Sequence, residues 1–245
     1  MMGNAAAVTD RSFAVPDGVN NGQYGVGIVI DFFGLAGKYS GFPVDFVYPS
    51  MTSVVPANIA LIAGGKNPDE AKKFMAFSMS TEGQQLLFDP KISRLPILPY
   101  SQLKAPAGYP DPQEVAKRAK VQFDANLSEA RYQVVTSLFD QMVTFRLKEL
   151  QGATKAIQDA EKALKAKPNA RGSDLVKQAR ALAYTPLVGA ENVKNEQFLE
   201  LFRKSRRDVE VSKQLSGQEQ LWANKARENY ARAQQLATEA RGLAK

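Results

Sequence analysis

Cysteine and histidine are both absent from this 245-residue chain. It therefore has no thiol nucleophile, no thiolate or imidazole metal ligand and no imidazole for a Ser–His–Asp relay. Disulfides are excluded as well, so cysteine usage does not identify the compartment. Carboxylates alone could support acid–base chemistry, but no pair of them stands out. These absences narrow the possible enzyme chemistry without excluding it, and we expect neither catalysis nor a cofactor in this protein.

Long apolar runs are missing too. No window reaches the roughly 18 consecutive apolar residues that a membrane span needs. The first residues, MMGNAAAVTDRSF, lack the basic start and the apolar stretch of about 7–15 residues that mark a secretory signal. We therefore expect that the chain as printed is not exported.

Acidic residues are in deficit, with 25 Asp and Glu against 32 Lys and Arg, and the formal net charge is +7. The first 110 residues hold as many basic as acidic side chains, so the whole surplus lies in residues 111–245. We expect two parts: a neutral half, rich in Gly and Pro, over residues 1–110, and a basic helical half over residues 111–245.

The first half contains short apolar runs separated by Gly, Pro and Asn. Residues 26–30 (VGIVI) form a β-branched run typical of a strand buried on both faces. Residues 42–48 and 58–63 are predicted as further strands. Asn67, Pro68 and Glu70 then give the N-cap, first position and third position of a helix. Its Ala71, Phe74, Met75 and Met79 are expected to face a core. The order predicts an α/β fold.

The second half has helical periodicity throughout. A broad apolar face predicts a well-buried helix over residues 128–150, and a narrower stripe continues it to Leu164. Ser216 and Glu219 form a capping box that should open a helix reaching Arg241. Other helices are predicted over residues 173–184 and 195–211.

Polar side chains lie where two predicted strands end. Asp31 directly follows the first strand, and hydroxyl groups cluster after the second, at Tyr48, Ser50 and Thr52. Ligands of open α/β sheets bind beyond the carboxyl ends of strands, near helix N-termini. We therefore predict that these four residues bind an anionic or polyol ligand. The alternative for Asp31 is a helix cap.

Several segments of the chain resemble one known family. Over residues 11–165 the chain is similar to bacterial extracellular solute-binding proteins of ABC-type importers, in the ferric-ion and phosphoglycerate-transport-type subgroup. The segments that carry the resemblance are GVNNGQYGVGIVID, VYPSMTSVVPANIALI, KNPDEAKKFMAFSMSTEGQQLL and FDPKISRLPILP. The resemblance implies a periplasmic-binding-protein-like type II fold, of which this chain holds only the carboxy-terminal part. The first lobe would lie outside it.

The resemblance also implies a function and a location. A small anionic or phosphorylated solute would be captured by lobe closure about a hinge near residues 54–62, then delivered to the membrane permease of the importer. The location would be periplasmic. Ferric members carry adjacent tyrosines after the second-lobe strand, whereas this chain has Phe32 and Phe33 there. Phenylalanine cannot ligate a metal, so ferric ion is disfavoured.

Two alternatives depend on the helical half. Residues 111–165 would pack on a lobe, while residues 166–245 would form a helical extension. In the first alternative the helices make an interaction or regulatory protein that binds a membrane sensor or a partner helix. In the second, the cluster Arg203, Lys204, Arg206 and Arg207 attracts nucleic acid. Acidic residues interleave with this cluster and aromatic residues are few, so a nucleic-acid partner is not expected.

Overall fold

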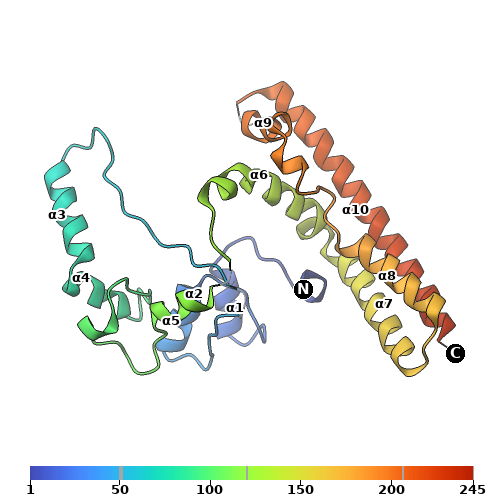
Figure 1. Ribbon diagram of the computed structural model, residues 1–245, viewed down its shortest axis with the longest axis horizontal. Helices are drawn as coiled ribbons and strands as arrows, with labels where there is room; N and C mark the ends of the chain where they lie inside the picture. The colour runs from blue at the N-terminus through green and yellow to red at the C-terminus, as the bar shows by residue number, and fades with distance from the viewer. Residues whose placement is uncertain (50–51, 120, 206, 245) are drawn as a thin grey trace. The chain divides into compact units, whose positions relative to one another are not determined.

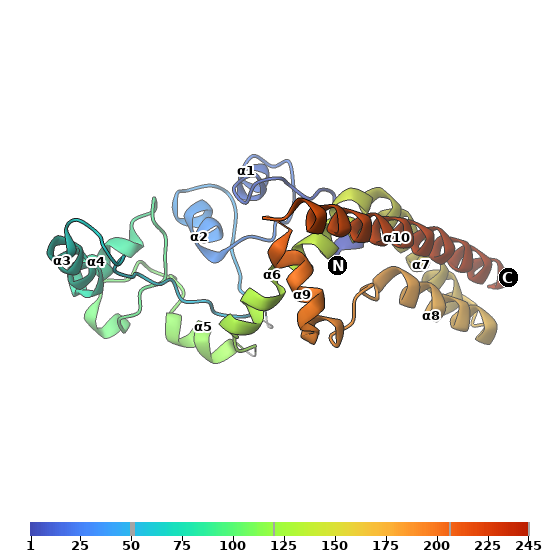
Figure 2. The ribbon, with the colours of Figure 1, turned by 90° about the horizontal axis from the view of Figure 1, so that it is seen from above.

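The computed structural model describes residues 1–49, 52–119, 121–205 and 207–244. The chain separates into two compact units. One is Thr9–Asp124; the other, here called the helical unit, combines Met1–Val8 with Ala125–Lys245. Figures 1 and 2 follow the chain through both.

The predicted α/β class is wrong, because the described residues contain helices and no β-strand. The three apolar runs expected as strands are irregular, and many of their side chains face solvent: Val26 is 87% exposed and Ile62 is 81% exposed. β-branched residues favour an extended backbone, but a strand also needs a neighbouring chain segment to complete its hydrogen-bond ladder. Within the described ranges these runs have no such neighbour. The protein is therefore all-α in the part that the structure describes.

The Thr9–Asp124 unit is built from short helices. Leu35, Phe88, Leu103 and Tyr109 form its buried cluster. Two 3-10 turns, η2 (Leu86–Phe88) and η3 (Tyr100–Gln102), connect its later segments. Its α-helices are α1 (Ala14–Asn20), α2 (Asp31–Tyr39), α3 (Pro68–Met79), α4 (Thr81–Gln85) and α5 (Pro112–Arg118).

Helix α3 begins where the sequence predicted, with Pro68 as its first residue and Asn67 at the N-cap. The expected core face is wrong, however. No residue of α3 is buried, and Phe74 and Met79 are both exposed. Amphipathic spacing identifies an apolar face, but burial requires another element to cover that face.

The helical unit begins with the 3-10 turn η1 (Met2–Asn4). Its α-helices are α6 (Ala125–Met142), α7 (Leu147–Ala166), α8 (Ala170–Tyr184), α9 (Glu196–Lys204) and α10 (Val209–Leu243). Short 3-10 turns, η4 (Thr144–Arg146) and η5 (Asn192–Lys194), join some of them. Helix α10 has 35 residues and packs against α6, α7, α8 and α9. Figure 1 shows it running beside α7 and α8.

Small side chains fill the contact between α7, α8 and α10. Alanine lets helix backbones approach closely, and Ile157, Leu164, Tyr230 and Leu236 occupy the remaining space. The small residues of α10 therefore pack against α7 and α8 of the same chain. The buried alanines are Ala153, Ala160, Ala179, Ala183, Ala226, Ala233, Ala237 and Ala240.

Several predicted helix boundaries are wrong, and the helix expected over residues 195–211 ends at Lys204. Helix α10 begins at Val209 and not at Ser216, because the Asp208 carboxylate accepts hydrogen bonds from the backbone N–H groups of Glu210 and Val211. The capping box at Ser216 therefore lies inside a helix that has already started. The single helix expected over residues 128–150 is instead interrupted after Met142 by η4.

A second buried cluster joins α6, α9 and α10. It contains Val134, Leu199, Phe202 and Trp222. The rings of Phe202 and Trp222 are stacked, with centroids 6.0 Å apart and an interplanar angle of 15°. This cluster fixes α9 and α6 on the first half of α10.

Candidate functional site

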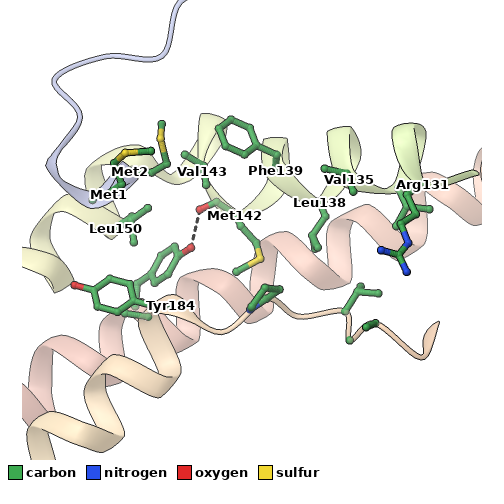
Figure 3. A pocket seen from close by; sticks show the side chains of 18 residues that line it. Met1, Met2, Arg131, Val135, Leu138, Phe139, Met142, Val143, Leu150 and Tyr184 are labelled. Atoms are coloured by element: carbon green, nitrogen blue, oxygen red, sulfur yellow. Dashed lines mark hydrogen bonds between the residues drawn. The ribbon is translucent and has the colours of Figure 1, made fainter. Parts of the chain in front are cut away.

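The helical unit contains a cavity of about 520 Å³ along α6. We call it the α6 groove. Its walls come from residues 1–3, one face of α6 with the following Val143, Leu150 of α7, residues 183, 184, 186 and 188–190, and Tyr230 of α10. Figure 3 shows these side chains. All of them belong to the helical unit, so the groove is a feature of one compact body.

The apolar wall of the α6 groove follows from the sequence spacing. Val135, Leu138, Phe139 and Met142 recur three and four residues apart, which places them on one helical face. The sequence predicted a well-buried helix here, and this is wrong in part. Val134 is the buried residue of α6, whereas Val135 is 55% exposed and Phe139 is 39% exposed. The rest of the unit covers one side of α6 and leaves this stripe open.

Arg131 is the one charged side chain among the groove-lining residues. Its Nε is shielded from solvent and has no hydrogen-bond partner. Figure 3 places Arg131 at one end of the groove, while Met1, Met2, Leu150 and Tyr184 lie at the other. The groove therefore has a cationic end and an apolar end.

The tyrosine hydroxyls of the groove already have partners. The Tyr230 hydroxyl donates a hydrogen bond of 2.7 Å to the carbonyl of Met142, where α6 ends. Burial raises the pKa of Tyr230 to about 12. The Tyr184 hydroxyl lies 3.3 Å from Thr154 Oγ1. Arg131 is therefore the side chain best placed to meet a polar group of a ligand.

Replacing Tyr230 by phenylalanine should lower the free energy of unfolding of the helical unit by about 1–3 kcal/mol, because the Met142 carbonyl would lose its partner. Urea denaturation followed by circular dichroism measures the change. Tyr184→Phe is the matched control and should change it by less, since this hydroxyl makes a longer contact from a partly exposed ring. Equal effects of the two substitutions would show that the hydrogen bond from Tyr230 to Met142 does not stabilise the unit as we expect.

Residues 1–3 are held at the apolar end of the groove by contacts with α7. Gln151 Nε2 donates to the carbonyl of Ala5 at 2.7 Å, and Gln158 Nε2 donates to Asn4 Oδ1 at 2.9 Å. Gly3 lies so close to α7 that a Cβ there would fall 1.9 Å from Thr154 Oγ1. Glycine at this position permits the approach that brings Met1 and Met2 to the groove.

Of the four residues predicted to bind a ligand, Asp31 is the first residue of α2 in the other unit. Asp31 and Tyr48 do meet, because the Tyr48 hydroxyl donates to Asp31 Oδ2 at 2.9 Å. Asp31 Oδ1 also accepts from the backbone N–H of Phe32 at 2.8 Å. No hydrogen bond joins Thr52 to this pair within the described residues, and Ser50 lies outside them. Ligand binding by these residues stays a prediction.

Alkaline pH should destabilise the Thr9–Asp124 unit. Burial raises the pKa of Tyr48 and Tyr100 far above the ordinary value and that of Tyr109 to about 12. The Asp31 carboxylate adds to the effect at Tyr48. Unfolded phenols titrate near about 10, so above that pH the unfolded state binds fewer protons than the folded state. The stabilisation is fully present below about pH 10 and is lost as the pH rises toward the folded values.

Phenolate absorbance measures this titration. We expect part of the phenolate signal to appear above the range seen in denaturant, together with loss of helical circular dichroism. Tyr48→Phe should reduce the part of the phenolate signal that appears only at the higher pH. A native titration curve identical to the one in denaturant would contradict the prediction.

Two residues of the basic cluster near the end of α9 form ion pairs. Arg203 forms ion pairs with Glu196 and Glu200, and Lys204 pairs with Glu200. Arg206 lies outside the described residues. Such pairing leaves less charge free to bind phosphates.

Two kinds of feature are absent from the described part of the chain. No group of three or more acidic side chains is placed to hold a metal ion. None of the described helices combines the length and apolarity that crossing a membrane would require.

Comparison with known proteins identifies two curated relatives. The chain is similar to the phosphoglycerate transport regulatory proteins PgtC of Salmonella typhimurium and Salmonella typhi, with 30% identity over 164 residues in each case. The alignment covers 66% of this chain and 40% of each relative, so the chain spans less than half of their length. No family model and no solved structure matches.

These findings correct the family assignment. The relatives are named as regulators of transport and not as solute-binding proteins. The described residues contain no sheet, whereas the resemblance implied an α/β receptor. We therefore conclude that the assignment of this chain to the extracellular solute-binding proteins of ABC importers is wrong. The predicted role as a solute-binding component of an importer is wrong with it.

Proposed function

We propose that this chain is a regulatory protein of phosphoglycerate transport that acts by binding another protein and not by catalysis. The observation that carries the proposal is the similarity to PgtC, whose name describes this role. The proposed partner is a membrane protein of the transport system or its sensor. This reading agrees with the helical interaction protein that the sequence offered as an alternative.

The extent of the similarity supports a role for both units. Thr9–Asp124 comprises 116 of the 245 residues, which leaves 129 for the helical unit. An alignment of 164 residues is longer than either unit, so it includes parts of both. A continuous stretch that covers 66% of the chain must also include its middle, where α6 lies.

The exposed face of α6 supports a binding role. Tyr132, Val135 and Phe139 are large apolar side chains that stay exposed on one helix. Contiguous apolar surface of this kind marks interaction sites on proteins. A partner helix could cover this stripe with its own apolar face, as helix-in-groove complexes do.

Uptake measurements test the proposed function. When the gene is deleted from the organism that carries it, we expect phosphoglycerate uptake to stop responding to external phosphoglycerate. Reintroducing the gene should restore this response. Val135→Asp should weaken the restored response, because it places a charge in the apolar stripe. Thr136→Asp, one residue along on the same helix and exposed, is the matched control. Uptake that responds normally without the gene would refute the proposal.

A further inference from the structure

The α6 groove has the dimensions and lining of a small-molecule site. Its volume of about 520 Å³ lies within the roughly 300–1,000 Å³ of typical ligand pockets, which are mostly apolar with a few polar groups. From Arg131 to Met142 the helix advances about 16 Å at 1.5 Å per residue. The apolar wall is therefore long and has the guanidinium of Arg131 at one end.

Arg131 is placed to bind an anion. Its Nε is shielded from water and unpaired, and the groove-lining residues include no carboxylate that could neutralise it. A guanidinium presents N–H groups in a planar fork that matches a carboxylate, and charge-assisted hydrogen bonds of this type are the stronger ones in proteins. A buried N–H group without a hydrogen-bond partner is energetically costly, so a ligand that supplies the acceptor removes that cost when it binds.

We propose that the α6 groove binds a single-chain anionic amphiphile of the fatty-acid type. Its head group pairs with Arg131, and its chain lies along Val135, Leu138 and Met142 toward the apolar end. The inference concerns the same exposed face of α6 that the proposed partner helix would cover, so ligand and partner would compete for Val135, but it rests on the groove and not on the similarity to PgtC. Phosphoglycerate itself does not match this groove, because a short, highly charged molecule would need several donors and would leave the apolar wall uncovered.

Titration of the full chain with dodecanoate, below the concentration at which it forms micelles, tests the inference. Binding is followed by calorimetry and by the emission of Trp222, which packs against Val134 of the groove wall. Dodecyl phosphate, dodecanol and 3-phosphoglycerate are the comparison ligands. We expect both anionic amphiphiles to bind about tenfold or more tightly than dodecanol. The ratio of dodecanoate to dodecyl phosphate affinity distinguishes a carboxylate head group from a phosphate one.

Arg131→Gln should weaken dodecanoate binding about tenfold and leave dodecanol binding unchanged. Val135→Glu provides a second route, because a carboxylate four residues from Arg131 on the same helix can pair with it. This variant should also weaken dodecanoate binding, whereas its matched control Val135→Gln should not. Position 135 is exposed, so these variants do not depend on repacking the core.

Three results would overturn the inference. The first is no binding of dodecanoate to the native chain. The second is equal loss of dodecanoate and dodecanol in Arg131→Gln, since the substitution would then have changed the shape of the groove and not its charge. The third is tighter binding of 3-phosphoglycerate than of dodecanoate. None of these measurements depends on phosphoglycerate uptake, so failure here is separate from failure of the proposed function.

Discussion

Trp222→Ala is expected to lower the free energy of unfolding of the helical unit by about 3–5 kcal/mol. The indole is buried between α9 and α10 and contacts the rings of Phe198 and Phe202. Its removal would leave a cavity and would remove the aromatic contacts that fix α9 on α10. Denaturation in urea, followed by circular dichroism, measures the change.

Leu221→Ala is the matched control for this substitution. Leu221 precedes Trp222 on the same helix but is 64% exposed, so its truncation removes little buried surface. We expect a change within about 0.5 kcal/mol. If Trp222→Ala destabilised the protein no more than Leu221→Ala, the aromatic cluster would not be an anchor.

Ile157→Ala is expected to cost about 2–5 kcal/mol. Ile157 is fully buried on α7, among alanines of α8 and α10. Those small side chains already lie in close contact, so they cannot move to fill the space that the missing methyl and methylene groups leave. The same urea denaturation gives the value.

The graded variant Ile157→Val checks this reasoning, because it removes a single methylene and should cost only about 0.5–1.5 kcal/mol. A cost for Ile157→Ala as small as that for Ile157→Val would show that the neighbouring helices can collapse around the site.

The helical half of the fold could be predicted from sequence because its signals are local. Ala153, Ile157, Ala160 and Leu164 recur at helical spacing, and all four are buried on α7. Each contact that defines such a face lies within a few residues along the chain. The boundary error at α10 is also local, since Asp208 caps the helix eight residues before the predicted start.

The first half could not be predicted in the same way. The β-branched residues of the run at 26–30 favour an extended backbone. Whether that run forms a strand depends on a distant segment that could pair with it. The described residues provide no such segment, so the β-branched side chains stay exposed. Sequence pattern gave the correct local preference and the wrong architecture.

The α6 groove escaped prediction for a related reason. Its apolar stripe was visible in the sequence and was interpreted as a buried face, because the spacing of Val135, Leu138 and Met142 does not reveal how much of α6 other helices cover. A usable signal was present. Arg131 precedes Val135 by four residues and Leu138 by seven, so it lies on the same face of the helix.

The position of α10 also has a consequence for synthesis on the ribosome. Helix α10 is the last to be translated in its unit, yet it contacts each of α6, α7, α8 and α9. The apolar faces of those four helices therefore lack their common support until residues 209–243 have left the exit tunnel. The nascent chain therefore carries unprotected apolar surface from the synthesis of α6 until α10 has emerged, and surface of this kind is what chaperones bind during translation.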